Sequence, residues 1–209
     1  MATLMSKTTA TVLGGLTATA IAIAGYSTLN QPQPVPVTTK PAITETATPK
    51  HVRQGYERTL FMPSGWPTRD GEQCNTRIET LRQQSTTPVT IENCKITAGT
   101  WQSPYDNVTH TNPADVQIDH IVPLANAWDS GAWQQNETTR EALAVDPLNL
   151  IAVTGTVNMA KSDKGPDEWM PEHWRCEYID RWVAVKRKYK LTFDDKELTV
   201  IKTELAKCD

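Results

Sequence analysis

The stretch Gln117-Ile118-Asp119-His120-Ile121-Val122-Pro123-Leu124 decides how this chain is organised. Its apolar residues predict a short buried strand that ends at Pro123, a residue favoured in the first turn of a helix. Asp119 and His120 are adjacent, so we expect them on opposite faces of the strand. A carboxylate and an imidazole are costly in an apolar run unless each has a partner. The stretch therefore predicts a functional site as well as a strand.

Partners for this pair are expected downstream. Residues 147–153 are mostly apolar and predict a second strand that carries Asn149. Residues 154–161 predict a helix that carries Asn158 and Lys161. The predicted order is strand, turn, strand, helix. Asp119 and His120 lie on the first strand, Asn149 on the second, and Asn158 and Lys161 on the helix.

This ordered set resembles the HNH endonuclease family of the ββα-metal (His-Me finger) superfamily, in a variant where Asp-His and Asn stand for the more familiar histidines. The likeness extends over residues 51–209, and its specificity rests on the ordered set rather than on one dipeptide. Further runs are similar to a secreted bacterial branch of the family; these are residues 74–77, 99–105, 119–128, 146–150 and 158–164.

The resemblance implies an α+β fold with a ββα-metal core. Residues 123–133 and 138–145 predict helical insertions between the two strands of the motif, and residues 75–84 and 89–91 predict an N-terminal helix and strand. Amphipathic patterns at the end of the chain predict an antiparallel helical hairpin; they run over residues 172–190 and 196–207.

The resemblance also implies roles in phosphodiester hydrolysis. His120 is expected to be the general base, and Asn149 is expected to accept the other imidazole N–H through its side-chain oxygen. Asp119 and Asn158 are expected to bind a divalent metal, Mg²⁺ or in its place Mn²⁺, because an oxygen site with few protein ligands suits Mg²⁺.

Three cations are candidates for contacts with substrate phosphate: Lys161, Lys164 and Arg77. For Arg77, an ion pair beside a disulfide is the competing interpretation. The formal net charge of −3 argues against non-specific binding of a polyanion unless positive charge is local. Residues 186–190 are a basic run that could supply it.

The beginning of the chain predicts export. Residues 8–25 carry no charge and follow Lys7, which is typical of a signal peptide and, if uncleaved, of a membrane anchor. We therefore expect residues 1–25 to be a signal peptide or anchor, residues 26–50 a disordered Thr/Pro-rich linker, and residues 51–209 the HNH-like domain. The expected location is outside the cell or in its envelope.

Four cysteines in an exported chain predict disulfides, and none is spaced as Cys-x-x-Cys. Of the three possible pairings, sequence order favours Cys74 with Cys94 and Cys176 with Cys208. The helical hairpin supports the second pair, because arms of similar length bring its two cysteines level.

Two functions are compatible with these features. The first is an exported, metal-dependent nuclease acting on DNA or RNA, with nucleic acid as its partner, membrane contact only through an uncleaved N-terminal segment, and no protein partner evident. The second is a non-catalytic envelope module that keeps the fold for binding. An oriented base favours the first, and the acidic net charge favours the second.

Overall fold

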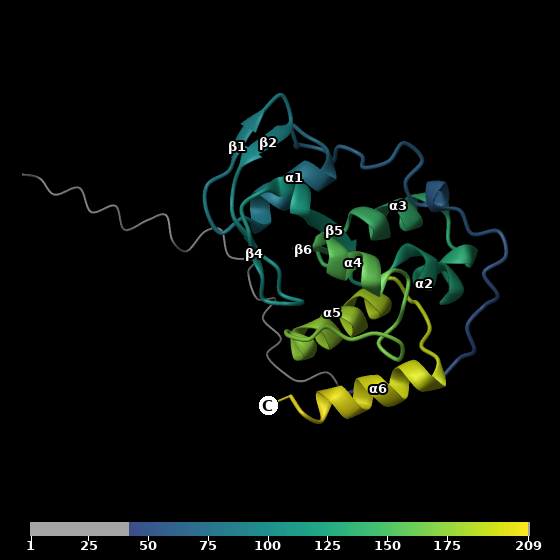
Figure 1. Cartoon of the computed structure of the whole chain (residues 1–209). Coiled ribbons are helices and arrows are strands. Elements are labelled where there is room, and N and C mark those ends of the chain that lie inside the picture. Colours follow the sequence, from purple (N-terminus) through teal and green to yellow (C-terminus); the bar gives the residue numbers. More distant parts are fainter. Residues whose placement is uncertain (1–41, 209) are drawn as a thin grey trace, which may run out of the picture.

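The computed structural model describes residues 42–208, and its elements are labelled in Figure 1. The α-helices are α1 (Thr76–Gln84), α2 (Leu124–Asp129), α3 (Glu137–Val145), α4 (Gly155–Lys161), α5 (Arg175–Lys188) and α6 (Asp195–Leu205). The strands are β1 (Thr90–Glu92), β2 (Lys95–Ala98), β3 (Trp101–Gln102), β4 (Thr109–His110), β5 (Val116–His120) and β6 (Leu150–Thr154). Single 3-10 turns are η1 (Arg58–Leu60), η2 (Pro113–Asp115) and η3 (Ala132–Gln134). The fold is α+β, as the sequence predicts.

The antiparallel hairpin of β5 and β6, followed directly by α4, forms the centre of the molecule (Figure 1). Its register pairs Asp119 with Ile151 and His120 with Leu150. Because side chains alternate along a strand, Asp119 and His120 point to opposite faces of the hairpin. The predicted order of strand, turn, strand and helix is confirmed.

Apolar clusters pack on both faces of this hairpin. The smaller cluster lies against α1 and consists of Leu81, Ile96, Trp101, Val116, Ile118, Leu150 and Ala152. The larger cluster contains Ile151 and Val153 of β6 and most of the buried apolar residues of α2, α3, α5 and α6. The face that carries His120 is therefore the face of the smaller cluster, and Asp119 points towards the larger one.

The insertion between β5 and β6 differs in one respect from the sequence prediction. A single helix over residues 123–133 was expected, but α2 ends at Asp129 and η3 begins at Ala132. Gly131 between them has a φ of +117°, a left-handed conformation that side-chain-bearing residues disfavour and that ends a helix. The second insertion helix, α3, is confirmed.

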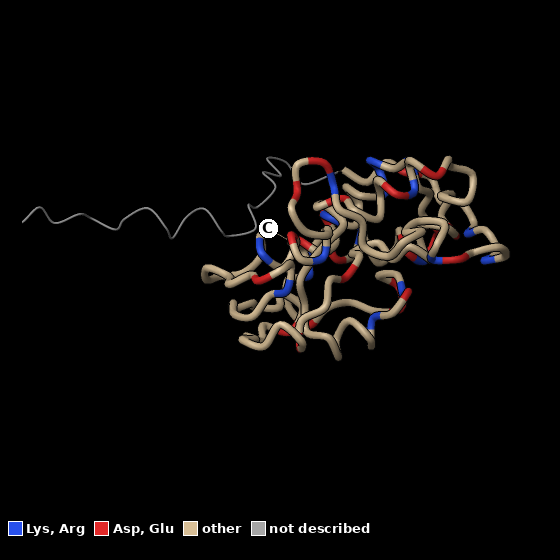
Figure 2. Tube along the Cα trace, turned by 90° about the horizontal axis from the view of Figure 1, so that it is seen from above, with Lys and Arg blue, Asp and Glu red and all other residues tan. Residues whose placement is uncertain are grey.

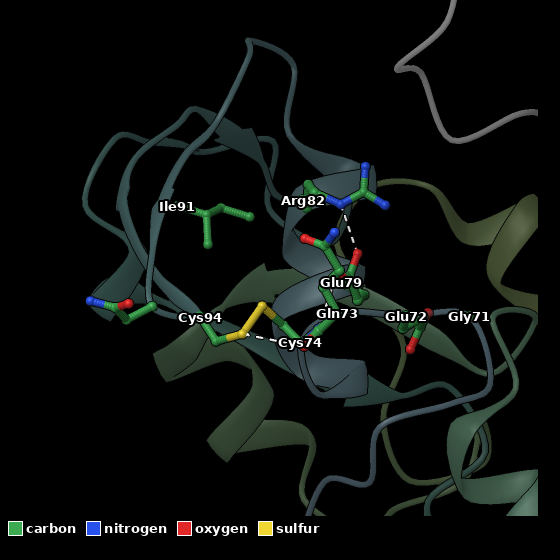
Figure 3. Close-up of a pocket in the computed structure, with 9 residues that line it drawn as sticks. Gly71, Glu72, Gln73, Cys74, Glu79, Arg82, Ile91 and Cys94 are labelled. Atoms are coloured by element: carbon green, nitrogen blue, oxygen red, sulfur yellow. Dashed lines mark hydrogen bonds and ion pairs between the residues drawn. A yellow bond between two sulfur atoms is a disulfide. The ribbon is translucent and has the colours of Figure 1, made fainter.

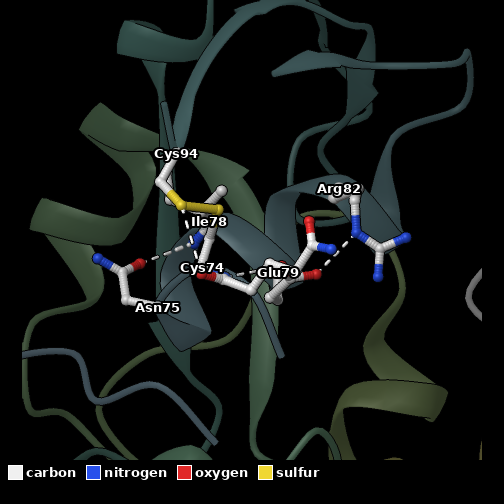
Figure 4. The surroundings of a disulfide bond; sticks show 7 residues. Cys74, Asn75, Ile78, Glu79, Arg82 and Cys94 are labelled. Carbon is white, nitrogen blue, oxygen red and sulfur yellow. Dashed lines mark hydrogen bonds and ion pairs between the residues drawn. A yellow bond between two sulfur atoms is a disulfide. The ribbon is translucent and has the colours of Figure 1, made fainter. Parts of the chain in front are cut away.

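The first disulfide ties the β1–β2 turn to the start of α1 (Figure 4). It joins Cys74 to Cys94, whose Cα atoms are 5.4 Å apart. The side chain of Asn75 caps α1 by accepting the backbone N–H of Ile78 at 3.1 Å. Glu79 accepts the N–H of Cys74 at 3.3 Å. The predicted pairing is confirmed, and it fixes the N-terminal extension to the helix that covers one face of the hairpin.

The C-terminal helices α5 and α6 form the expected hairpin, closed by the disulfide Cys176–Cys208. Asp194 and Glu197 form a reciprocal capping box at the start of α6. Lys186 and Glu197, both fully buried, form an ion pair between the two helices. The hairpin lies along the side of the molecule opposite α1 (Figure 1).

Residues 42–50 depart from the disordered linker that composition predicts. They form no helix or strand, but the N–H of Thr48 donates to the carbonyl of Phe193 at 2.7 Å, and Lys50 pairs with Asp194 at 2.9 Å. These contacts hold the segment against the C-terminal hairpin. The predicted export segment, residues 1–25, lies outside the described residues.

Charge is mixed over the described residues, and Figure 2 shows basic and acidic positions interspersed along the trace. In the basic run at 186–190, Lys186 is buried with Glu197, Arg187 pairs with Glu45, and Lys188 pairs with Asp146. Lys190 is exposed, and one exposed lysine does not make a positive patch. Between residues 42 and 208, no helix has the length and apolar character to cross a membrane.

Candidate active site

Asp119 on β5 is buried and fully engaged. The hydroxyl of Tyr105 donates to its Oδ2 at 2.7 Å, and the Nζ atom of Lys161 lies 3.0 Å from both of its oxygens. Burial raises the pKa of Asp119 and lowers the pKa of Lys161, because both charged forms lose hydration. The buried carboxylate of Asp119 is therefore compensated by the buried ammonium of Lys161.

His120, the next residue, is 5% exposed and lies on the other face. Its Nε2 atom is 2.8 Å from the carbonyl oxygen of Ala144, the penultimate residue of α3. A carbonyl can only accept, so Nε2 carries the proton and Nδ1 keeps the lone pair of the neutral ring. Burial, opposed by the bond to Ala144 and aided by the positive charges of Arg58 and Lys161, lowers the pKa of His120 to about 3. The imidazole is a neutral base of fixed tautomer.

The expectation that Asn149 accepts the imidazole N–H is wrong, because that proton goes to Ala144. Asn149 is instead fully buried, and its Oδ1 accepts the N–H of Val122 at 2.8 Å. Its Nδ2 donates to the carbonyls of Val122 at 3.2 Å and Leu143 at 3.4 Å. Asn149 thus joins the segment after β5 to the end of α3, and it places the carbonyl of Ala144 indirectly.

Asn158 lies on α4 on the Asp119 side of the hairpin. Its Nδ2 donates to Oε1 of Gln117 at 2.8 Å, and Gln117 is two residues before Asp119 on the same face of β5. The structure therefore brings Asp119, Lys161, Gln117 and Asn158 together on one face. It leaves His120 on the other.

The three cations expected at substrate phosphate lie in different surroundings. Lys161 is 0% exposed and also donates to the carbonyl of His120 at 2.9 Å, and its expected contact with phosphate stays a prediction. Arg77 donates to the carbonyl of Val116 at 3.1 Å, a contact that supports β5. Lys164 is exposed, and its Nζ donates to the carbonyl of Ala160 at 2.9 Å near the end of α4. Only Lys164 is open to solvent.

The expected metal ligands, as they are placed, do not fit a divalent cation. Both oxygens of Asp119 are taken by Tyr105 and Lys161, and the amide of Asn158 donates to Gln117. In the part of the chain from 42 to 208, no cluster of three His, Cys, Asp or Glu side chains is placed to hold a metal ion. The side-chain oxygens of Asp119 and Asn158 are donors of the kind that Mg²⁺ prefers. The ammonium of Lys161, however, already occupies the position beside the carboxylate of Asp119 where a metal ion would bind.

Two residues of this site carried no signal in the sequence that assigned them to it. Trp66 stacks on the imidazole of His120, with ring centroids 5.4 Å apart and planes 1° from parallel. Arg58, which is exposed, acts on His120 through its charge. Both precede the motif by more than 50 positions, so only the folded chain brings them to the base.

A cavity of 620 Å³ lies elsewhere, at the junction of α1 with the β1–β2 turn (Figure 3). It is lined by the Cys74–Cys94 disulfide, the Glu79–Arg82 ion pair and Ile91, among others. None of the motif residues lines it. The cavity therefore plays no part in the site described above.

The hairpin and the helix that follows it form the centre of a small α+β domain. A family model described as the C-terminal domain of GmrSD restriction endonucleases matches residues 75–203. An "Uncharacterized secreted protein" of Arthroderma benhamiae is 39% identical over 191 residues, which cover 84% of this chain and 92% of the relative. No solved structure matches. The chain belongs to the family of GmrSD restriction endonuclease C-terminal domains.

Proposed function

We propose that this chain is an exported HNH-type nuclease that hydrolyses phosphodiester bonds of DNA or RNA with His120 as the general base. The observation that carries the proposal is the bond from His120 Nε2 to the carbonyl of Ala144, which leaves the Nδ1 lone pair for a proton. Membership of a nuclease-related family supports the same chemistry.

The base acts on water. Nδ1 takes a proton from a water molecule, the hydroxide attacks phosphorus, and the leaving oxygen takes up a proton from solvent as its bond to phosphorus breaks. The imidazolium formed in this step donates its Nε2–H to Ala144 more strongly than the neutral ring does. Ala144 lies at the carboxyl end of α3, where the helix dipole favours a cation. The negative charge of the phosphate also favours the protonated ring and opposes the effect of burial.

Asn149 supports this base by holding two backbone segments. Because it bonds Val122 on one side and Leu143 on the other, it keeps the end of α3 at a fixed distance from β5. The acceptor for His120 is the residue after Leu143. Loss of Asn149 should therefore misplace the imidazole without removing it.

Arg58 and Lys164 are the exposed cations that we propose as phosphate contacts. Arg58 is the one whose charge reaches His120, and a guanidinium can bind two phosphate oxygens at once. Lys161 serves a different purpose as the counterion of Asp119. The expectation of Mg²⁺, with Mn²⁺ as a substitute, stays a prediction, and a divalent ion on Asp119 requires the ammonium of Lys161 to leave.

Export is the second part of the proposal. It is supported by two disulfides, by the uncharged segment at residues 8–25, and by a relative whose name describes a secreted protein. The chain would then meet nucleic acid outside the cell or in the envelope.

Nicking of supercoiled plasmid tests the nuclease proposal. Purified, oxidised protein is incubated with plasmid or with RNA, with Mg²⁺ and with chelator. We expect cleavage that is lost in chelator. Binding of either nucleic acid without any cleavage would instead support the non-catalytic module, and cleavage undiminished in chelator would refute the metal prediction while keeping the nuclease.

A further inference from the structure

Trp66 is the only aromatic ring among the described residues that stacks on the imidazole of His120. The two planes are 1° from parallel and the centroids are 5.4 Å apart, an offset stack. Trp66 is partly buried and packs against both apolar clusters. It lies before residues 75–203, the part that the family model matches.

The loop that carries Trp66 is tied to the same helix end that holds His120. The guanidinium of Arg69 donates to the carbonyl of Val145 at 3.2 Å, and His120 donates to the preceding carbonyl, Ala144. The carbonyl of Pro67, the residue after Trp66, accepts two hydrogen bonds from Thr76 at the start of α1. The backbone N–H of Thr76 lies at 2.8 Å and its hydroxyl at 2.7 Å. Trp66 and the acceptor for the imidazole therefore share one support.

A hydrogen bond and a stacked ring restrict the imidazole in different ways. The bond to Ala144 fixes the position of Nε2, but the ring torsion of a histidine is broad and one bond leaves the plane free to turn about the N–H direction. A parallel indole removes that freedom, because turning the imidazole would drive its edge into the indole face. The two contacts together define where the Nδ1 lone pair points.

We propose that Trp66 is a positioning residue for His120, which holds the plane of the imidazole while Ala144 holds its Nε2–H. The proposal rests on the nuclease function proposed above. It adds a residue from outside the family-matched region to the machinery, and it predicts an effect on turnover rather than on substrate binding.

Three variants test the proposal. Trp66→Phe keeps a ring that can stack, Trp66→Leu fills the space without one, and Trp133→Leu removes a tryptophan that stacks on another histidine, His51, at 4.3 Å and 20°. With a short labelled duplex as substrate, Trp66→Leu should lower kcat about 10- to 100-fold with KM within about 3-fold of wild type. Trp66→Phe should recover most of kcat, and Trp133→Leu should match wild type.

Equal kcat in Trp66→Leu and Trp133→Leu would overturn the proposal. So would a rise in KM with kcat unchanged, because that result belongs to a substrate contact. If Trp66→Leu does not fold, Trp66→Phe together with Trp66→Met decides, since methionine also lacks a ring.

A second measurement does not need catalysis. In ¹⁵N spectra of the ring nitrogens, with His120 assigned by the signals lost in His120→Asn, wild type should show one tautomer, protonated at Nε2. In Trp66→Leu the imidazole is free to turn and its bond to Ala144 weakens, so the second tautomer is populated and the two nitrogen shifts should move towards each other. In Trp66→Phe the ring stays stacked and the shifts should not move. Unchanged shifts in Trp66→Leu would refute the positioning role, even if the protein cleaves no nucleic acid. If wild type is inactive but the nitrogen shifts change in Trp66→Leu, only the nuclease function is refuted.

Discussion

The buried imidazole of His120 should make the protein lose stability in acid by a predictable amount. Its folded pKa of about 3 lies below the ordinary value of 6.5, so the unfolded chain takes up a proton at this residue in a range where the folded chain does not. The stabilisation is thus complete above about pH 6.5 and is lost as pH falls towards about 3. At about 1.4 kcal/mol per pKa unit, lowering the pH from about 7.5 to 4.5 should cost about 2.5 kcal/mol from this one residue.

The assay is urea unfolding of wild type and His120→Asn at both pH values. Asparagine does not titrate, so the variant should lose about 2.5 kcal/mol less than wild type over the interval, whatever the other groups contribute. His173→Asn, which changes an exposed histidine, serves as the matched control and should lose as much as wild type. An equal loss in wild type and His120→Asn would show that the imidazole is accessible to protons in the folded state, and the geometry of the base would be wrong.

Three further predictions concern the groups around the base. Lys161→Met leaves the carboxylate of Asp119 buried without its cation, so it should lower the free energy of unfolding by about 3–5 kcal/mol. If Lys161 and a metal ion compete for Asp119, Mn²⁺ should raise the melting temperature of this variant more than that of wild type. Equal responses to Mn²⁺ would contradict that competition. Asn149→Ala should reduce kcat about 10- to 100-fold, less than loss of His120 does, and unchanged turnover would exclude its supporting role. Replacing Cys176 and Cys208 by serine opens a loop of sequence separation 32 and should cost about 4 kcal/mol in chemical denaturation with little direct effect on kcat; mass mapping that links either cysteine to Cys74 or Cys94 would refute the pairing.

Local patterns in the sequence were sufficient to predict the frame of the site. The apolar runs around Asp119 and Asn149 predict the two strands of the hairpin, and the patterns over residues 75–84 and 196–207 predict the helices α1 and α6. These features depend on residues a few positions apart, so periodicity reveals them. The disulfides follow for a similar reason, because each closes a unit that is contiguous in the sequence.

The partners of the site residues could not be predicted in the same way. The acceptor for His120 is the backbone of Ala144, and a carbonyl leaves no mark in the sequence. Lys161 is buried although lysine is normally exposed, because Asp119 and the carbonyl of His120 compensate its charge. Trp66 reaches the imidazole only through the tertiary packing of its loop.

Cleavage of a phosphodiester substrate by wild type and by His120→Ala, at equal protein concentration, is the most direct test of the central claim. The side chain of His120 acts on water, so the variant should retain folded structure and nucleic-acid binding while cleavage falls by at least about 100-fold, the lower end of the range for loss of a general base. Wild-type turnover in His120→Ala would contradict the account at its centre, because no other imidazole in residues 42–208 shares the contact with Ala144.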